Sequence, residues 1–335
     1  MSREQLPTEL WILISTDSDL ETEDQMNLSL VCWKFRHICA PSILYSVTFP
    51  CTRKGLEGLQ ELSHSELRQY VERLRYYMPP FCKFPVEDPG AGEDHDELVE
   101  VKKIIQERSE ENQYIVDSEL DLTALSLALQ SLPCLSDLIF SFRNFIPGEQ
   151  DQVSRKLSGL HAKKETFEHH IPVLAQAVSQ ARTVGRHFSS IRLVGFQLPR
   201  LPESEVLGDD ERAQVVLRDS VKELFAEVGC VRLSLGGSVF NLCEKTRLSL
   251  RELHILNLAV DYEVLKSFLR HNISTLRRIE YYNLQLRNQP EEEDRWLKPS
   301  FFSKILHSFH LNSRIWRRGR DELNWTFTRG DCGFE

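Results

Sequence analysis

The sequence predicts an α/β protein in which a short helical module precedes an irregular solenoid of helices and parallel strands. The first 49 residues carry apolar side chains at helical spacing. Short strand-like runs then recur along the rest of the 335-residue chain, and amphipathic helical segments lie between them. Because the chain would cross over through a helix before each new strand, we expect the strands to pair in parallel.

The first helix is expected to begin near Leu6. Pro7 suits the first turn of a helix, where its missing backbone N–H is not needed. Leu10, Leu13 and Ile14 follow at spacings of three and four residues, so they form one apolar stripe. This spacing predicts a helix with one face that binds another apolar surface.

A second helix is expected to begin at Thr22, because Thr22 and Gln25 have the spacing of a capping box. Its apolar positions, three or four residues apart, are Leu28, Val31, Phe35 and Ile38, with Cys32 beside them. Pro41 should end this helix. A segment of about 45 residues cannot bury so many apolar side chains by itself, so it requires a partner surface.

The Leu-Pro-x-Glu-Leu opening at residues 6–10 and the LSLVCWKF run at 28–35 together resemble the F-box. This resemblance implies docking to the Skp-type adaptor, and through it to the cullin, of an SCF ubiquitin ligase. The residues expected to contact the adaptor are Leu6, Pro7, Leu10, Ile14, Leu28, Val31, Cys32 and Phe35. The alternative is a helical hairpin that packs on its own downstream domain.

Three regions are expected along the chain. Residues 1–49 form the F-box, and residues 50–120 form a connector with a first repeat strand and a flexible, acidic Pro/Gly-rich loop at 85–97. Residues 121–335 form an irregular domain with a loose Leu-x-x-Leu-x-Leu pattern. The clearest copies begin at Leu250 and Leu276; their separation of 26 residues lies within the range typical of leucine-rich repeats.

Weaker copies of this pattern lie at 71–76, 135–140, 188–193 and 228–233, and helices are expected at 121–131, 171–181, 210–227 and 262–271. The alternative is an α+β domain of another topology. The whole arrangement resembles fungal F-box proteins with degenerate leucine-rich repeats. Such proteins are non-catalytic substrate receptors of ubiquitin ligases. A scaffold that binds the adaptor outside a ligase, and an enzyme hidden in the repeat domain, remain the other hypotheses.

Composition narrows the partners and the compartment. Apolar residues make up 41% of the chain, charged residues 27%, and the formal net charge is −9, which disfavours a nucleic-acid or anionic-membrane binder. No long apolar run or secretory signal is evident, so we expect a cytoplasmic or nuclear protein. The eight cysteines contain no C-x-x-C pair, and we expect no metal and no cofactor.

The sequence contains no recognisable catalytic motif. The adjacent His169 and His170 are expected to be structural. Because side chains alternate along a strand, one residue of each repeat should point to the open face of the sheet. That column is Arg75, Ile139, Arg192, Arg232, His254 and Glu280. Its basic members, Arg75, Arg192, Arg232 and His254, predict an acidic or phosphorylated substrate, although they could also be solubilising residues on a protein whose substrate binds loops.

Overall fold

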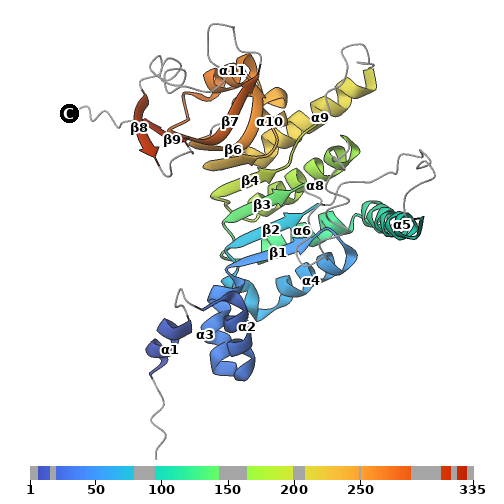
Figure 1. Ribbon diagram of the computed structural model, residues 1–335, viewed down its shortest axis with the longest axis vertical. Helices are drawn as coiled ribbons and strands as arrows, with labels where there is room; N and C mark the ends of the chain where they lie inside the picture. Colours follow the sequence, from blue (N-terminus) through green and yellow to red (C-terminus); the bar gives the residue numbers. More distant parts are fainter. Residues whose placement is uncertain are drawn as a thin grey trace, which may run out of the picture.

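The protein is built around one nine-stranded sheet (Figure 1). The computed structural model describes residues 7–15, 20–78, 95–142, 164–198, 208–248, 250–287, 311–317 and 323–329. Its first seven strands are parallel and follow one another in chain order. These strands are β1 (Ser46–Pro50), β2 (Arg73–Tyr77), β3 (Asp137–Ser141), β4 (Ser190–Val194), β5 (Cys230–Ser234), β6 (Glu252–Asp261) and β7 (Arg278–Arg287).

Helices form a layer along one side of these strands (Figure 1). The layer comprises α4 (Arg53–His64), α6 (Leu120–Ser131), α8 (Lys164–Thr183), α9 (Gly208–Phe225), α10 (Ser238–Leu242) and α11 (Tyr262–Asn272), and the short 3-10 helix η1 (Glu66–Tyr70) precedes β2. Successive helices of the layer contact one another. Within the described chain, no helix combines the length and the apolar character needed to cross a membrane.

Two rows of residues, in register across the strands, face the helices and form the core. One row is Val47, Leu74, Leu138, Ile191, Val231, Leu253 and Ile279, and the other is Phe49, Tyr76, Phe140, Leu193, Leu233, Ile255 and Tyr281. All are buried except Phe49, which is half-buried. Each buried side chain of this size contributes about 1.5–3 kcal/mol of transfer free energy, so these rows bind the helices to the sheet.

The expected parallel order is confirmed, and the expected helices and repeat strands are found within about two residues of their predicted positions, except that α8 begins at Lys164, well before the predicted start at 171. The C-terminal end differs. There β8 (Leu311–Arg317) and β9 (Leu323–Arg329) form an antiparallel pair, and β9 also pairs antiparallel with β7. The expectation of parallel strands throughout was therefore wrong for the last two. No Leu-x-x-Leu-x-Leu copy had marked this segment.

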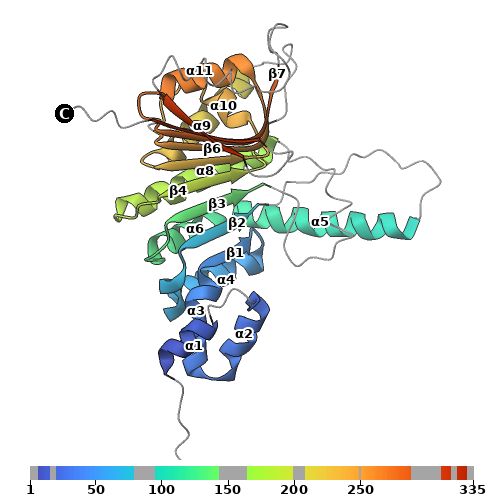
Figure 2. The same cartoon turned by 60° about the vertical axis from the view of Figure 1, so that its left-hand side comes forward.

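Residues 46–120 also hold elements that the sequence analysis did not predict. Strand β1 lies within the range 1–49 assigned to the N-terminal module, and it is the first strand of the sheet. The helix α5 (His95–Asp117) is 23 residues long and projects from the helix layer (Figure 2). Residues 95–97 are thus helical instead of part of the expected loop, and residues 85–94 lie outside the described residues.

The N-terminal module contains three helices, α1 (Thr8–Ser15), α2 (Thr22–Val31) and α3 (Trp33–Leu44). A single helix from Thr22 was expected, but the backbone of Cys32 is extended, with φ −162° and ψ 165°. This break allows α3 to turn and pack against α2 and α1. Cys39 and Ala40 are buried as a result.

Two further local expectations were wrong. Pro41 does not end the helix, because α3 continues to Leu44, which packs against the core. Packing of Leu44 against the core helps to offset the helical hydrogen bond that Pro41 cannot donate. α2 does begin at Thr22 as expected, but its N-cap is Glu21 instead of Thr22, and the Glu21 N–H donates to Asp24 Oδ2 at 3.3 Å.

The substitution Gly236→Ala is expected to lower the free energy of unfolding by about 1–3 kcal/mol. An added Cβ would lie 2.2 Å from the carbonyl oxygen of Phe196, which is backbone and has little room to move. Gly229→Ala is the matched control, because its Cβ would meet nothing nearer than the Ser189 carbonyl oxygen at 3.6 Å. Urea denaturation measures both; equal midpoints would contradict this close backbone approach.

Candidate functional site

Exposed apolar side chains concentrate on α1, α2 and the start of α3, which lie beyond β1 at one end of the molecule (Figure 1). The most exposed of these side chains are Leu30, Val31 and Trp33, with exposed fractions of 76%, 68% and 75%. The whole group is Leu10, Ile12, Leu13, Ile14, Met26, Leu30, Val31 and Trp33. Elsewhere in the described chain, the exposed large apolar residues are scattered. Such a concentration is typical of a surface that contacts another protein.

The residues expected to contact the adaptor fall into two groups. Pro7, Leu10, Ile14, Val31 and Cys32 are exposed, whereas Leu28 and Phe35 are half-buried. The Phe35 ring packs edge-on against Trp11 with 4.8 Å between centroids, so it supports the module from within. Leu6 lies outside the described residues.

Several exposed apolar residues were not predicted, among them Met26, Leu30 and Trp33. The predicted apolar positions assume that one helix continues through Cys32. Because the helix breaks at Cys32, the phase of the apolar positions changes there. The signal available in the sequence was the four consecutive apolar residues from Leu30 to Trp33, since a single amphipathic helix would not place apolar residues on all sides.

The second candidate surface is the face of the sheet that the helices leave open. The predicted column Arg75, Ile139, Arg192, Arg232, His254 and Glu280 is one continuous row of the structure, with each residue in register with the next. All are half-buried except Ile139, which is 9% exposed. The side-chain alternation inferred from the sequence therefore placed these residues together correctly.

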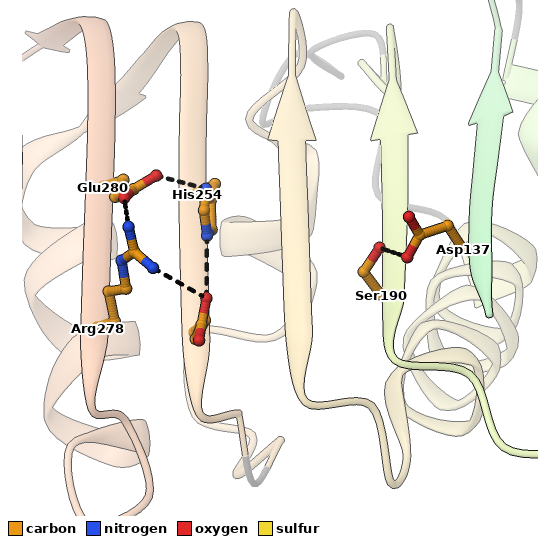
Figure 3. A network of polar contacts seen from close by, with 6 residues as sticks. Asp137, Ser190, His254, Arg278 and Glu280 are labelled. Carbon is orange, nitrogen blue, oxygen red and sulfur yellow. Dashed lines mark hydrogen bonds and ion pairs between the residues drawn. The ribbon is translucent and has the colours of Figure 1, made fainter. Parts of the chain in front are cut away.

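At the β6–β7 end, the open face carries a network of opposite charges (Figure 3). His254 Nδ1 lies 2.7 Å from Glu280 Oε2, and His254 Nε2 lies 3.4 Å from Glu252 Oε2. Arg278 pairs with Glu280 and reaches Glu252 at 3.9 Å. Burial lowers the pKa of His254, although the two carboxylates oppose this shift. The charged groups of this end are thus paired with one another within the protein.

A smaller network lies between β2 and β4. Arg73 Nη2 donates to Asp137 Oδ2 at 3.1 Å. The Ser190 hydroxyl donates to Asp137 Oδ1 at 2.7 Å (Figure 3). Burial raises the pKa of Asp137, but hydrogen bonds from Ser190 and Arg73 outweigh it, so the pKa lies below its usual value. Arg73 therefore already has a carboxylate partner.

The middle of the row is different. For Arg75, Arg192 and Arg232, no ion pair with a carboxylate is found among the described residues. Burial lowers the pKa of Arg192, and the positive charges of Arg232, Arg73 and Arg75 lower it further. The region from β2 to β5 is therefore a concentration of positive charge on a chain whose net charge is negative.

Two clusters have donor atoms of the types that bind zinc. Cys230, Glu252 and His254 lie on the open face with their donor atoms within 4.8 Å of one another. Arg232 and Arg278 lie beside this cluster and would repel a cation, since Arg232 contacts the Cys230 thiol and Arg278 reaches Glu252. The arrangement is better suited to internal charge pairing than to metal binding.

The other cluster, Cys51, Asp121 and His170, is fully buried under the helix layer. His169 Nε2 lies 2.9 Å and His170 Nδ1 lies 3.6 Å from the same Asp121 oxygen, so two adjacent helical histidines converge on one carboxylate. Burial raises the pKa of the Cys51 thiol to about 12, which disfavours the thiolate that a zinc ligand requires. We interpret this cluster as a polar network within the core.

Opposing effects act on the pKa values of this network. Burial raises the pKa of Asp121, but hydrogen bonds and positive charge from His169 and His170 outweigh burial, so the pKa lies well below its usual value. Burial lowers the pKa of His170, and the hydrogen bond to Asp121 only partly opposes that shift. The folded state therefore favours ionised Asp121 together with neutral His170.

No protein-family model matches the chain, and no curated protein sequence matches it. We therefore infer function from the contacts, burial and charge of the residues themselves.

The free energy of unfolding is expected to decrease as pH falls from 7 to 5. Because the folded-state pKa of His170 lies below about 6.5, its value in unfolded chains, the unfolded state takes up the proton first. Below about pH 4, the lowered pKa of Asp121 also decreases the free energy of unfolding, because the unfolded state again takes up the proton first. One such group contributes a slope of at most about 1.4 kcal/mol per pH unit.

Denaturant unfolding at several pH values checks this expectation. His170→Asn should flatten the slope between pH 5 and 7, whereas His64→Asn, which replaces an exposed histidine of α4, serves as the matched control. A wild-type slope in the His170 variant would show that this histidine does not carry the pH dependence.

Proposed function

We propose that the protein is a substrate receptor of an SCF-type ubiquitin ligase. In this proposal, α1–α3 dock to the Skp-type adaptor, and the open face of the sheet binds a protein substrate. The observation that carries the proposal is the concentration of exposed apolar side chains on the segment whose sequence resembles an F-box. An exposed apolar surface of this kind favours association, since burying each such side chain contributes about 1.5–3 kcal/mol.

The arrangement of the two surfaces supports the same role. The apolar surface lies at the β1 end of the molecule, while the open face of the sheet extends from β1 to β7 (Figure 2). Binding at one surface therefore leaves the other accessible. A receptor needs this separation, because it acts by raising the local concentration of a bound substrate near the enzyme that transfers ubiquitin.

The long row of in-register residues supports the leucine-rich-repeat-like part of the proposal. Repeat proteins of this kind bind partners on extended surfaces formed by successive strands. We assign no catalytic residue to the chain, and ubiquitin transfer would come from other subunits of the complex. The resemblance to F-box proteins also implies a cytoplasmic or nuclear location.

The double variant Leu10→Asp/Val31→Asp is expected to reduce adaptor binding by at least about 100-fold. Both side chains are exposed, so the variant should fold, but two charges would be desolvated against an apolar partner at a cost of several kcal/mol. Titration of a purified Skp-type adaptor by calorimetry measures the affinity. Val184→Asp/Val215→Asp places the same charges on exposed apolar sites away from α1–α3, in the turn after α8 and on α9, and should bind normally.

Undiminished adaptor binding by the Leu10/Val31 variant would refute the docking surface. Copurification of a cullin with the wild-type complex distinguishes a ligase subunit from a scaffold that binds the adaptor alone. If the adaptor binds and the cullin is consistently absent, the scaffold hypothesis replaces the receptor.

A further inference from the structure

The open face of the sheet divides into a part whose charged groups pair with one another and a part whose arginines lack a carboxylate partner among the described residues. At the β6–β7 end, Arg278 and His254 are paired with Glu252 and Glu280. From β2 to β5, the described residues give Arg73 its partner Asp137 but give no carboxylate to Arg75, Arg192 or Arg232. The charge that remains is therefore localised over strands β2–β5.

Arg192 and Arg232 form the centre of this charge. They are paired in register on β4 and β5. Because neighbouring strands lie about 4.8 Å apart, the two side chains leave the sheet from adjacent Cα atoms on the same face. Two like charges at this separation repel each other, and the Arg232 charge adds to the larger effect of burial in lowering the pKa of Arg192. Such an arrangement is unfavourable in the free protein and becomes favourable when an anion bridges the two groups.

Hydrogen-bond donors of the pair are also unused. The Nε atoms of Arg192 and Arg232 are buried, and neither has a hydrogen-bond partner among the described residues. Arg278 also has a buried Nε without a partner, but its terminal nitrogens are occupied by carboxylates. Because burying a donor without a partner is unfavourable, the Arg192–Arg232 pair has two reasons to accept an external ligand.

The floor beside the pair is apolar. Ile139 lies between Arg75 and Arg192 in the row and is only 9% exposed, although it is on the open face. The aliphatic stems of neighbouring arginines can cover such a residue and hold their charged ends above it. An anion bound there would be partly shielded from water, which strengthens its interaction with the guanidinium groups.

We propose that Arg192 and Arg232, together with Arg75, bind a phosphoryl group on a phosphorylated segment of a protein substrate. This inference rests on the proposed function, because it takes the open face as the substrate surface.

A phosphoryl group fits this site better than a carboxylate does. It carries a charge of about −1.5 to −2 and three acceptor oxygens, so it can bridge two guanidinium groups at once. A carboxylate has one charge and two oxygens, which one arginine fork already satisfies. Glu252 and Glu280, farther along the face, also make it less favourable for a uniformly acidic segment to continue across β6 and β7.

The test uses three fluorescein-labelled pools of nonapeptides with random flanks and a central phosphoserine, serine or glutamate. Fluorescence anisotropy with the full chain should give at least about tenfold tighter binding for the phosphoserine pool than for the glutamate pool. Binding should weaken as salt rises. The variant Arg192→Gln/Arg232→Gln should reduce phosphoserine-pool binding to the level of the serine pool.

Arg212→Gln/Arg218→Gln is the matched control, because it removes the same charge from exposed sites on α9 and should bind like the wild type. Arg192→Lys/Arg232→Lys keeps the charge but loses the fork geometry, and it should bind at an intermediate level. The far-ultraviolet circular dichroism spectrum and the thermal midpoint confirm that each variant is folded.

Equal binding of the phosphoserine and glutamate pools would overturn the phosphoryl assignment. Binding that is equally strong in the Arg192/Arg232 variant, or absent in the wild type, would overturn the site. Adaptor titration with the same variant separates the two proposals. If the phosphoserine pool binds but the adaptor does not, the ligase role fails and the phosphoryl site stands.

Discussion

The architecture depends on the register of seven parallel strands. Because consecutive residues point to opposite faces of a strand, a fixed register divides every strand into residues that face the helices and residues that remain open. The helix-facing rows are continuous and apolar, from Val47 to Ile279 in one row. A slip of one residue would expose these rows and bury Arg192 and Arg232. The core and the charged row are therefore specified by the same constraint.

Different elements cover the two ends of the sheet, and this separates the exposed apolar surface of α1–α3 from the charged row on the open face. An unpaired strand edge exposes backbone donors and acceptors. Beyond β7, the antiparallel strands β9 and β8 continue the hydrogen bonding. At the β1 end, the N-terminal helices lie beyond the first strand (Figure 1). The exposed apolar residues of α1–α3 thus lie at an end of the molecule, apart from the middle of the charged row.

The sequence predicted those parts of the structure in which a pattern of apolar residues recurs many times. The repeat strands and the open row from Arg75 to Glu280 were predicted because alternation over six strands is redundant. The break at Cys32 and the passage of α3 through Pro41 were missed, because packing between helices decides them. The convergence of His169 and His170 on Asp121 was also missed, because His169 is 48 positions from Asp121 and no local pattern links residues so far apart.

The Asp121 network and the Arg192–Arg232 pair differ in whether the folded chain supplies partners of opposite charge. In the Asp121 network, the carboxylate has its histidine partners inside the chain, so its energy is fixed at folding. At β4 and β5, the folded chain brings two guanidinium groups together without supplying a carboxylate among the described residues. Folding is driven by the apolar rows on the other face, which are strong enough to tolerate this repulsion. In the proposed phosphoryl site, the bound anion would relieve this repulsion, so the interaction free energy that folding leaves unused would become available for recognition.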